Sequence, residues 1–141
     1  MNAPLYTTEI LRLAASLKEP CRLEHEDAVV RLRSSTCGSR IETVVQLDSE
    51  LRLHALSQQV LACAFGQASA ALLELGATGR SRNDVATALA ELCEWLEGSD
   101  RVPSWPRIEA LEPARSRRSR HDSILLPFRA LLAAMDAACR G

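Results

Sequence analysis

The sequence predicts an α+β fold, in which a three-stranded antiparallel sheet packs against helices and the C-terminal half is helical. Three β-rich stretches follow one another between residues 28 and 55, and alanine- and leucine-rich helical patterns fill the chain after residue 63. Consecutive strands with short connections favour an antiparallel meander. The length of 141 residues suits one domain, which we expect to span 1–141.

The chain opens with the pattern of an amphipathic helix. Apolar residues recur at i, i+3, i+4 and i+7 from Ile10 to Leu17, which places them on one helical face. Thr7 or Thr8 can cap this helix, and Pro20 ends it.

Three predicted strands come next. Residues 28–34 are β-branched and interrupted by arginines, and residues 40–47 alternate between two faces. A polar turn at 48–50 leads into a third alternating stretch at 51–55.

Two helices are predicted in the middle of the chain. Residues 63–75 are rich in alanine and leucine, and Gly76 and Gly79 mark the end of this helix. Residues 81–84 have the pattern of a capping box and lead into a second helix that reaches Leu96.

The C-terminal part contains breakers, a basic segment and one more helix. A loop at 98–106 precedes a short turn at 108–111. Four arginines fall within 115–120, which we interpret as a solvated connector, with a docking patch for an acidic partner as the alternative. An apolar stripe at 124–135 predicts the last helix. Because proline fits only the first turn of a helix, we expect this helix to begin just before Pro127.

Composition excludes several classes of protein. Hydrophobic residues make up 47% and charged residues 25%, which is ordinary globular usage and argues against disorder. A net charge of −1 does not favour binding to nucleic acid or to an anionic membrane. No apolar run approaches the roughly 18 residues needed to span a bilayer, and the start of the chain lacks the pattern of a cleaved signal peptide. We therefore expect a cytoplasmic protein.

The cysteines favour a reducing compartment. Their number is odd, and neither a CxxC nor an HExxH motif is present, which argues against a disulfide framework, a zinc finger and a zincin. The five are Cys21, Cys37, Cys63, Cys93 and Cys139.

Two of these cysteines lie where chemistry is possible. Cys37 precedes Gly38 in a turn between two predicted strands, and Cys63 lies where a strand gives way to a helix. A thiol near a helix N-terminus lies at the positive end of the helix dipole, which favours the thiolate that binds metal or carries sulfur. Two such thiols on adjacent loops make a soft-metal site plausible, whereas burial as small hydrophobic residues is the alternative.

Beyond these local patterns, the chain resembles the iron–sulfur cluster scaffold family of the IscU, NifU N-terminal domain and SufU type. The order and spacing of five segments carry the resemblance, which covers nearly the whole chain. The segments are an opening helix at Tyr6–Ala14, a first ligand loop at Ser35–Ser39, a strand at Thr43–Asp48, a second ligand loop at Ala62–Cys63 with Ala68–Ser69, and a third at His121–Leu125.

The resemblance implies a ligand set that this sequence matches only in part. Members of the family assemble a cluster or hold zinc on three cysteines plus an aspartate or a histidine. Cys37 matches the first ligand and Cys63 the second, whereas Ser39 stands where the family has its aspartate. Asp122 stands at the position of the third cysteine, and His121 where some members have a ligand histidine. The resemblance thus implies Cys37 and Cys63, completed by His121 or Asp122, as ligands of a transient iron–sulfur cluster or of Zn²⁺.

The implied fold is SufE/IscU-like, and the implied function is that of a scaffold rather than an enzyme. Such a protein takes sulfur as persulfide from a cysteine desulfurase and passes a cluster to acceptor proteins. We expect a monomer or a weak homo-oligomer that binds neither nucleic acid nor membrane. Two alternatives remain: a SufE-like persulfide acceptor that builds no cluster, and a desulfurase-binding regulator that no longer holds one.

Overall fold

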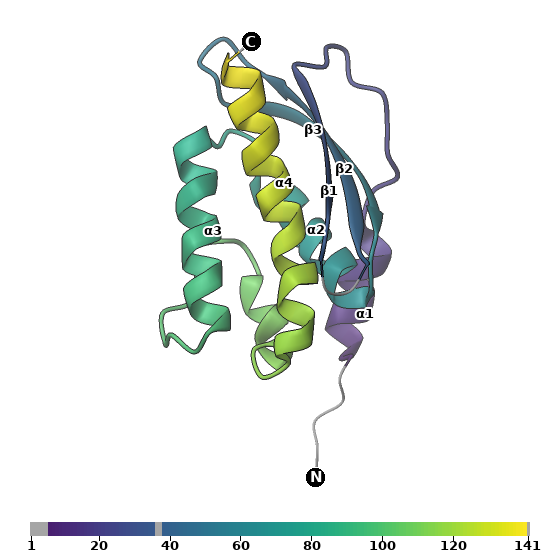
Figure 1. Cartoon of the computed structure of the whole chain (residues 1–141), viewed down its shortest axis with the longest axis vertical. Helices are drawn as coiled ribbons and strands as arrows, with labels where there is room; N and C mark the ends of the chain where they lie inside the picture. Colours follow the sequence, from purple (N-terminus) through teal and green to yellow (C-terminus); the bar gives the residue numbers. More distant parts are fainter. Residues whose placement is uncertain (1–5, 36–37, 141) are drawn as a thin grey trace.

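A computed structural model describes residues 6–35 and 38–140 of the chain (Figure 1). Within this part lie four α-helices, two short 3₁₀ helices and one three-stranded sheet, so the predicted α+β class is confirmed. The elements follow one another as α1 (Thr8–Ser16), β1 (Ala28–Arg33), β2 (Arg40–Leu47), β3 (Leu53–Leu61), α2 (Ala64–Gly76), α3 (Arg82–Leu96), the 3₁₀ helices η1 (Ile108–Ala114) and η2 (Arg118–Arg120), and α4 (His121–Arg140).

The sheet is the predicted antiparallel meander, in the order β1–β2–β3. Its third strand begins at Leu53 and runs to Leu61, well beyond the predicted stretch at 51–55. The sequence pattern did not predict this extension because residues 57–59 are all polar. Of these, Gln58 is 4% exposed, and its Nε2 donates to the carbonyl of Ala70 at 3.1 Å, so it belongs to the interior.

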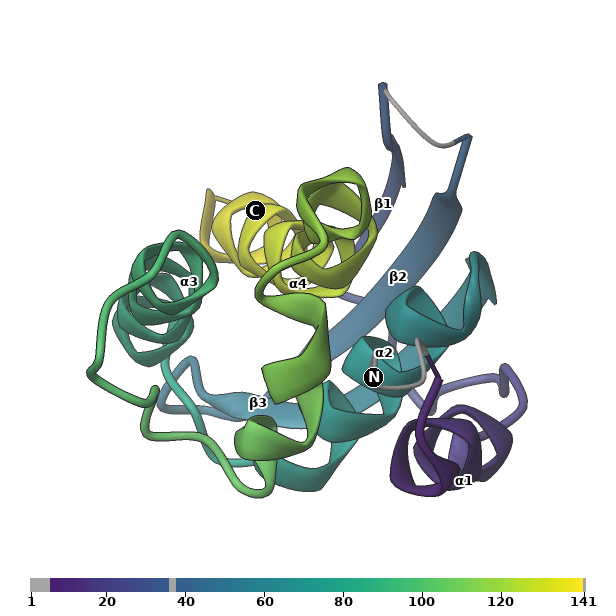
Figure 2. The ribbon, with the colours of Figure 1, turned by 90° about the horizontal axis from the view of Figure 1, so that it is seen from below.

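One face of the sheet is covered by α4, which in turn packs against α2 and α3 (Figures 1 and 2). Ile41 of β2 contacts Leu126 and Ala130 of α4, and the inward residues of β1 and β3 join this cluster. The main core forms where α2 and α3 meet α4, and α1 and η1 close it by packing against α2. Its largest fully buried side chains are Trp95, Phe65, Phe128, Ile10, Leu53, Leu72, Leu73, Leu92, Ile108, Leu111, Ile124 and Leu131.

The last helix begins earlier than predicted. We expected it to start just before Pro127, but α4 begins at His121, so the proline lies inside the helix. Pro127 has no N–H to donate to the carbonyl of Ser123, a loss that in an isolated helix costs about 3 kcal/mol. Here α2 packs against this stretch, and the hydroxyl of its Ser69 donates to the carbonyl of Ile124 at 2.5 Å. Burial of Pro127 against the neighbouring elements, rather than a replaced hydrogen bond, holds this part of α4 in place.

The basic segment at 115–120 is only partly the solvated connector that we expected. Arg117 and Arg118 are exposed, but Arg115 packs over the ring of Trp95 at 5.0 Å. Its Nε donates to the carbonyl of Trp95 at 2.8 Å and its Nη2 to that of Ser99 at 2.7 Å. Arg115 therefore ties η1 to the C-terminal end of α3, where backbone carbonyls lack helical partners. No helix in the described part of the chain is long and apolar enough to cross a membrane.

Candidate thiol site at one end of the sheet

Three segments converge at one end of the sheet. Arg40 at the start of β2 pairs with Arg33 at the end of β1 and with Leu61 at the end of β3. The connection from β1 to β2 and the approach to α2 therefore lie at the same end, and the first turn of α4 faces them (Figure 2). The backbone N–H of Ser34 donates to the carbonyl of Ser39 at 2.8 Å and closes the connection between the strands.

Cys63 is the N-cap residue of α2. It has the extended backbone typical of that position, and its side chain makes no capping hydrogen bond. The thiol is half-buried, and its Sγ lies 3.5 Å from the Oγ of Ser123 in α4. Cys63 thus lies at the junction of strand and helix, as the sequence predicts for this position.

Ser123 connects the three segments. Its side chain is 1% exposed, and its Oγ contacts both the Sγ of Cys63 and, at 3.2 Å, the Oγ of Ser39. Ser39 is itself 4% exposed. When Cys63 is a thiolate, its sulfur accepts a hydrogen bond from the Ser123 hydroxyl. The Ser123 oxygen can then accept a hydrogen bond from the hydroxyl of Ser39.

Small residues on α2 allow α4 to approach this closely. A Cβ atom at Gly66 would overlap the Oγ of Ser123 and would lie 2.6 Å from the Cβ of Ala62. One turn further along α2, Ser69 is fully buried and donates to the carbonyl of Ile124. Gly66 and Ser69 thus set the distance between Cys63 and Ser123.

His121 makes its contacts on another side of α4. Its Nε2 lies 3.0 Å from the carbonyl oxygen of Ala114 and 3.1 Å from that of Arg115. The ring lines a cavity of about 570 Å³ that also includes Glu97 and Gly98 after α3. Among the described residues, Ser123 and not His121 is the α4 side chain within hydrogen-bond distance of Cys63.

The remaining predicted ligands lie as follows. Asp122 is half-buried in the first turn of α4, with its Oδ1 3.7 Å from the Nη1 of Arg129. Cys37 lies outside the described residues. Across 6–35 and 38–140, no three His, Cys, Asp or Glu side chains come close enough together to hold a metal ion.

The donor chemistry around Cys63 limits what this site can hold. The described polar side chain that contacts its thiol is the Ser123 hydroxyl, whereas cluster iron prefers thiolate and zinc prefers thiolate, imidazole or carboxylate. The described residues thus offer a single thiol at this end of the sheet, with the Asp122 carboxylate in the adjoining turn. One thiolate can bind a soft metal ion weakly or accept sulfur, and a cluster needs further ligands.

The other described cysteines are poorly placed for this chemistry. Cys93 packs half-buried against the core, and burial raises the pKa of its thiol, which keeps it protonated. Cys21 and Cys139 are exposed and lie away from Cys63 in the chain, in the segment before β1 and in the last turn of α4.

Sequence reasoning missed Ser123 and Gly66. Ser123 lies in the third segment of the family resemblance, but we assigned no role to it or to a glycine within a predicted helix. A glycine three residues after an N-cap is a signal of close packing, because it weakens a helix unless another backbone or side chain approaches.

Comparisons with known proteins find similar solved structures. No family model and no curated protein matches the sequence. Among solved structures, the N-terminal part of a nitrogen-fixing NifU-like protein from Brucella abortus matches with a TM-score of 0.86 and 25% identity over 96% of this chain and 95% of that chain. A putative iron–sulfur cluster assembly scaffold protein for the SUF system from Fervidobacterium islandicum matches with a TM-score of 0.80 and 16% identity over 93% and 96%.

A third structure, of a hypothetical protein, matches with a TM-score of 0.71 and 20% identity over 91% of this chain and 96% of that chain. The chain thus has the IscU/NifU-like fold and matches NifU-like N-terminal and SufU scaffold proteins over nearly its whole length. The predicted resemblance and fold are confirmed.

Proposed function

We propose that this protein is a scaffold for iron–sulfur cluster assembly, which holds iron and sulfide through Cys37 and Cys63 and passes a cluster to acceptor proteins. The observation that carries the proposal is the place of Cys63 within a fold shared with such scaffolds. Its thiol stands at the N-cap of α2, in contact with α4, at the end of the sheet where the connection from β1 to β2 also lies. The fold is that of scaffold proteins, which are typically not catalysts.

Each residue has a distinct task in this proposal. Cys63 supplies one sulfur ligand at the start of α2, where the Ser123 hydroxyl can donate to it, and Cys37 supplies the second. Asp122 is the candidate to complete the ligand shell, since His121 directs its Nε2 to two backbone carbonyls. Iron or zinc held by two thiolates and a carboxylate keeps an open position, which suits temporary binding.

A second function is favoured by the Ser123 hydroxyl, which is not a metal ligand of the usual kind, next to Cys63. A persulfide acceptor needs one thiolate and no further metal ligands. In that reaction the Cys63 thiolate attacks the outer sulfur of a persulfide on a cysteine desulfurase. The S–S bond of the donor breaks, its cysteine leaves as thiolate, and a new S–S bond forms on Cys63, so that no oxidant or reductant is needed.

Metal and acid-labile sulfide analysis after anaerobic purification separates these functions. The wild type is compared with Cys37→Ser and Cys63→Ser, and with Cys139→Ser as a control, since Cys139 is exposed in the last turn of α4. Iron with matching sulfide, lost in the first two variants and kept in the control, supports the scaffold. Zinc without sulfide, or no metal, contradicts cluster holding.

Persulfide labelling of the same proteins after incubation with a cysteine desulfurase and cysteine completes the test. A persulfide on Cys63 that forms equally in Cys37→Ser, in a protein without metal, supports sulfur transfer. Binding to the desulfurase that survives the double Cys37→Ser, Cys63→Ser change, with neither metal nor persulfide in the wild type, supports a regulator instead.

A further inference from the structure

The face of the sheet opposite α4 carries a basic surface next to the candidate site. Side chains alternate along each strand, so the neighbours of the inward Leu32, Ile41 and Val60 point outward. These outward residues line a shallow hollow of about 500 Å³. We call it the basic sheet surface, and its outward side chains are Arg31 and Arg33 of β1, Arg40 and Glu42 of β2, and Gln59 and Leu61 of β3.

The charges on the basic sheet surface are not balanced. The Nε of Arg31 donates to Glu42 at 2.6 Å, which uses the one carboxylate of this surface. Arg33 and Arg40 stand directly opposite each other in the β1–β2 register, and neither has an ion-pair partner among the described residues. Like charges opposite each other destabilise a sheet. An anion bound between Arg33 and Arg40 would reduce the repulsion between their guanidinium groups.

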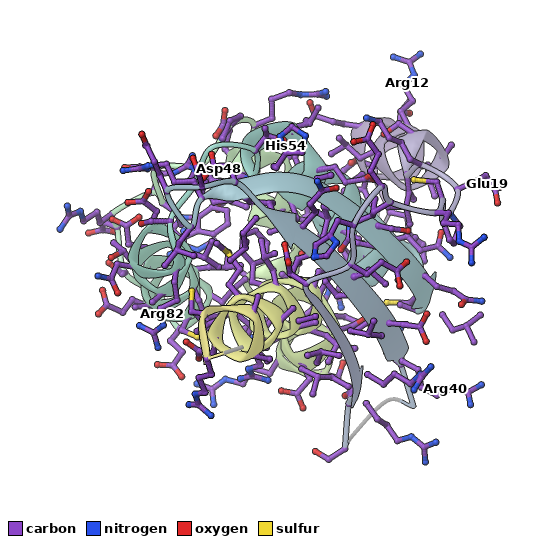
Figure 3. The ribbon with its side chains drawn as sticks, turned by 90° about the horizontal axis from the view of Figure 1, so that it is seen from above. Arg12, Glu19, Arg40, Asp48, His54 and Arg82 are labelled. Carbon is purple, nitrogen blue, oxygen red and sulfur yellow. The ribbon has the colours of Figure 1, made fainter. Side chains whose placement is uncertain are left out.

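The basic sheet surface is open and partly apolar. Arg31, Arg33, Arg40 and Gln59 are exposed, and Figure 3 shows Arg40 extending outward at the far side of the sheet from α3. Leu61 is 56% exposed and adds an apolar side chain to this surface. Guanidinium groups around an apolar side chain fit a peptide with carboxylates and apolar residues better than they fit a small anion.

This surface ends at the same end of the sheet as the candidate site. Leu61 precedes Cys63 by two residues, which places the two Cα atoms within about 7 Å of each other. Arg40 pairs with Leu61 across the sheet. A protein bound to the basic sheet surface therefore reaches the end of the sheet where Cys63 lies, and its approach to the thiol is around this end, since the thiol contacts Ser123 of α4.

We propose that the basic sheet surface docks an acidic segment of the cysteine desulfurase that delivers sulfur to Cys63. The inference rests on the proposed function and adds the binding surface and its chemistry. Arg33 and Arg40 bind carboxylates of the partner, and Leu61 packs against an apolar residue among them. Nucleic acid fits this surface less well, since no aromatic side chain lines it for base stacking.

The test measures binding of the organism's own cysteine desulfurase by calorimetry, and the rate at which Cys63 gains a persulfide. The full chain is compared with the double variants Arg33→Gln, Arg40→Gln and Arg33→Lys, Arg40→Lys. The matched control is Arg117→Gln, Arg118→Gln, which removes the same charge from exposed arginines outside the surface. All are measured at about 50 and 300 mM salt.

We expect the glutamine pair at 33 and 40 to weaken binding at low salt by at least tenfold, and the control pair by less than threefold. The lysine pair keeps most of the affinity, and the persulfide rate at saturating desulfurase is unchanged because the thiol is intact. The wild type loses more affinity with salt than the glutamine pair does.

Three results would overturn the inference. They are wild-type affinity in the glutamine pair, an equal loss in the control pair, and no measurable binding by the wild type. Tighter binding of a 20-nucleotide single strand through Arg33 and Arg40 would also overturn it, in favour of nucleic acid. Binding that follows the expected pattern without any persulfide on Cys63 would sustain the docking surface while refuting sulfur acceptance.

Discussion

The Oγ of Ser39 lies 3.2 Å from the Oγ of Ser123, although 84 positions separate the two residues in the chain. Both side chains are buried, and the same Ser123 oxygen contacts the Sγ of Cys63. A single hydroxyl thus fastens the residue before β2 and the N-cap of α2 to the first turn of α4.

Changing Ser123→Ala is expected to slow alkylation of Cys63 by iodoacetamide about three- to tenfold near neutral pH. The hydrogen bond to the thiolate is lost, and a bond of this kind contributes about 1 kcal/mol. Peptide-resolved mass spectrometry measures the rate at Cys63 separately from the other cysteines. Ser119→Ala, at an exposed serine, serves as the control and leaves the rate unchanged. An unchanged rate in Ser123→Ala would show that the hydroxyl does not act on the thiolate.

Gly66→Ala is expected to destabilise the fold by about 1–3 kcal/mol, even though alanine is the better helix former. The new Cβ would lie 2.6 Å from the Cβ of Ala62 and would overlap the Oγ of Ser123. Urea denaturation of Gly66→Ala, Ser123→Ala and the double variant gives the coupling between the two positions. Removing the Ser123 oxygen relieves part of the overlap, so the double variant must lose less than the sum of the single losses.

Arg115→Ala is expected to lower the free energy of unfolding by about 2–3 kcal/mol. Its guanidinium donates to the carbonyls of Trp95 and Ser99 and stacks on the Trp95 ring, and its side chain is only 22% exposed. Arg117→Ala removes the same charge from an exposed neighbour and should change stability by less than about 0.5 kcal/mol. Thermal and urea unfolding of both variants check this, and equal losses would mean that only the charge matters.

The N-terminus of α3 gives a pH-dependent prediction. The backbone N–H and the hydroxyl of Ser81, as hydrogen-bond donors, hold the pKa of Asp84 below its usual value. A lowered carboxyl pKa adds stability that is present above the unfolded value of 3.8 and is lost as the pH falls through the folded value.

Asp84→Ala should therefore cost about 0.5–1 kcal/mol near pH 7, and the difference from the wild type should shrink below about pH 3. Urea unfolding at both pH values measures it, with the exposed Glu24→Ala as the control. A difference that stays constant with pH would contradict the role of the charged carboxylate.

Thr43→Val is expected to stabilise the protein by about 0.5–1.5 kcal/mol. Thr43 is fully buried opposite Gln58, and its hydroxyl has no hydrogen-bond partner among the described residues. A buried hydroxyl without a partner costs free energy that a methyl group of similar size does not. The matched contrast is Ser69→Ala, which removes a buried hydroxyl that donates to Ile124 and must therefore destabilise. A loss of stability in Thr43→Val would indicate a bound water that the hydroxyl serves.

Local patterns predicted most of the fold. The alternation at 40–47, the capping box at 81–84 and the glycine at the end of α2 are all present as expected, because short-range sterics and hydrogen bonds decide them. The errors fall where tertiary contacts outweigh local preference. Gln58 continues β3 because Ala70 accepts its amide hydrogen bond, and Pro127 is tolerated inside α4 because that part of the helix is buried against neighbouring elements.

The candidate site was only partly predictable, for a related reason. The position of Cys63 at a helix N-terminus follows from the change of pattern in the sequence, and the structure has it there. The side on which each α4 residue makes its contacts does not follow from a motif. His121 and Ser123 are two residues apart, and about 200° of helical rotation separates them. Which of them meets Cys63 depends on how α4 packs against α2.

The antiparallel register also determines where the molecule can be modified without disturbing its chemistry. β2 runs from Arg40 at the thiol end to Leu47 at the other, a length of about 23 Å. The turn after Leu47 is held by Asp48, which accepts hydrogen bonds from the backbone N–H groups of Glu50 and Arg52. A dye or affinity handle attached to the exposed Glu50 side chain would leave this turn intact and stand a full strand length from Cys63. That position is the natural point of attachment for binding and fluorescence experiments on this chain.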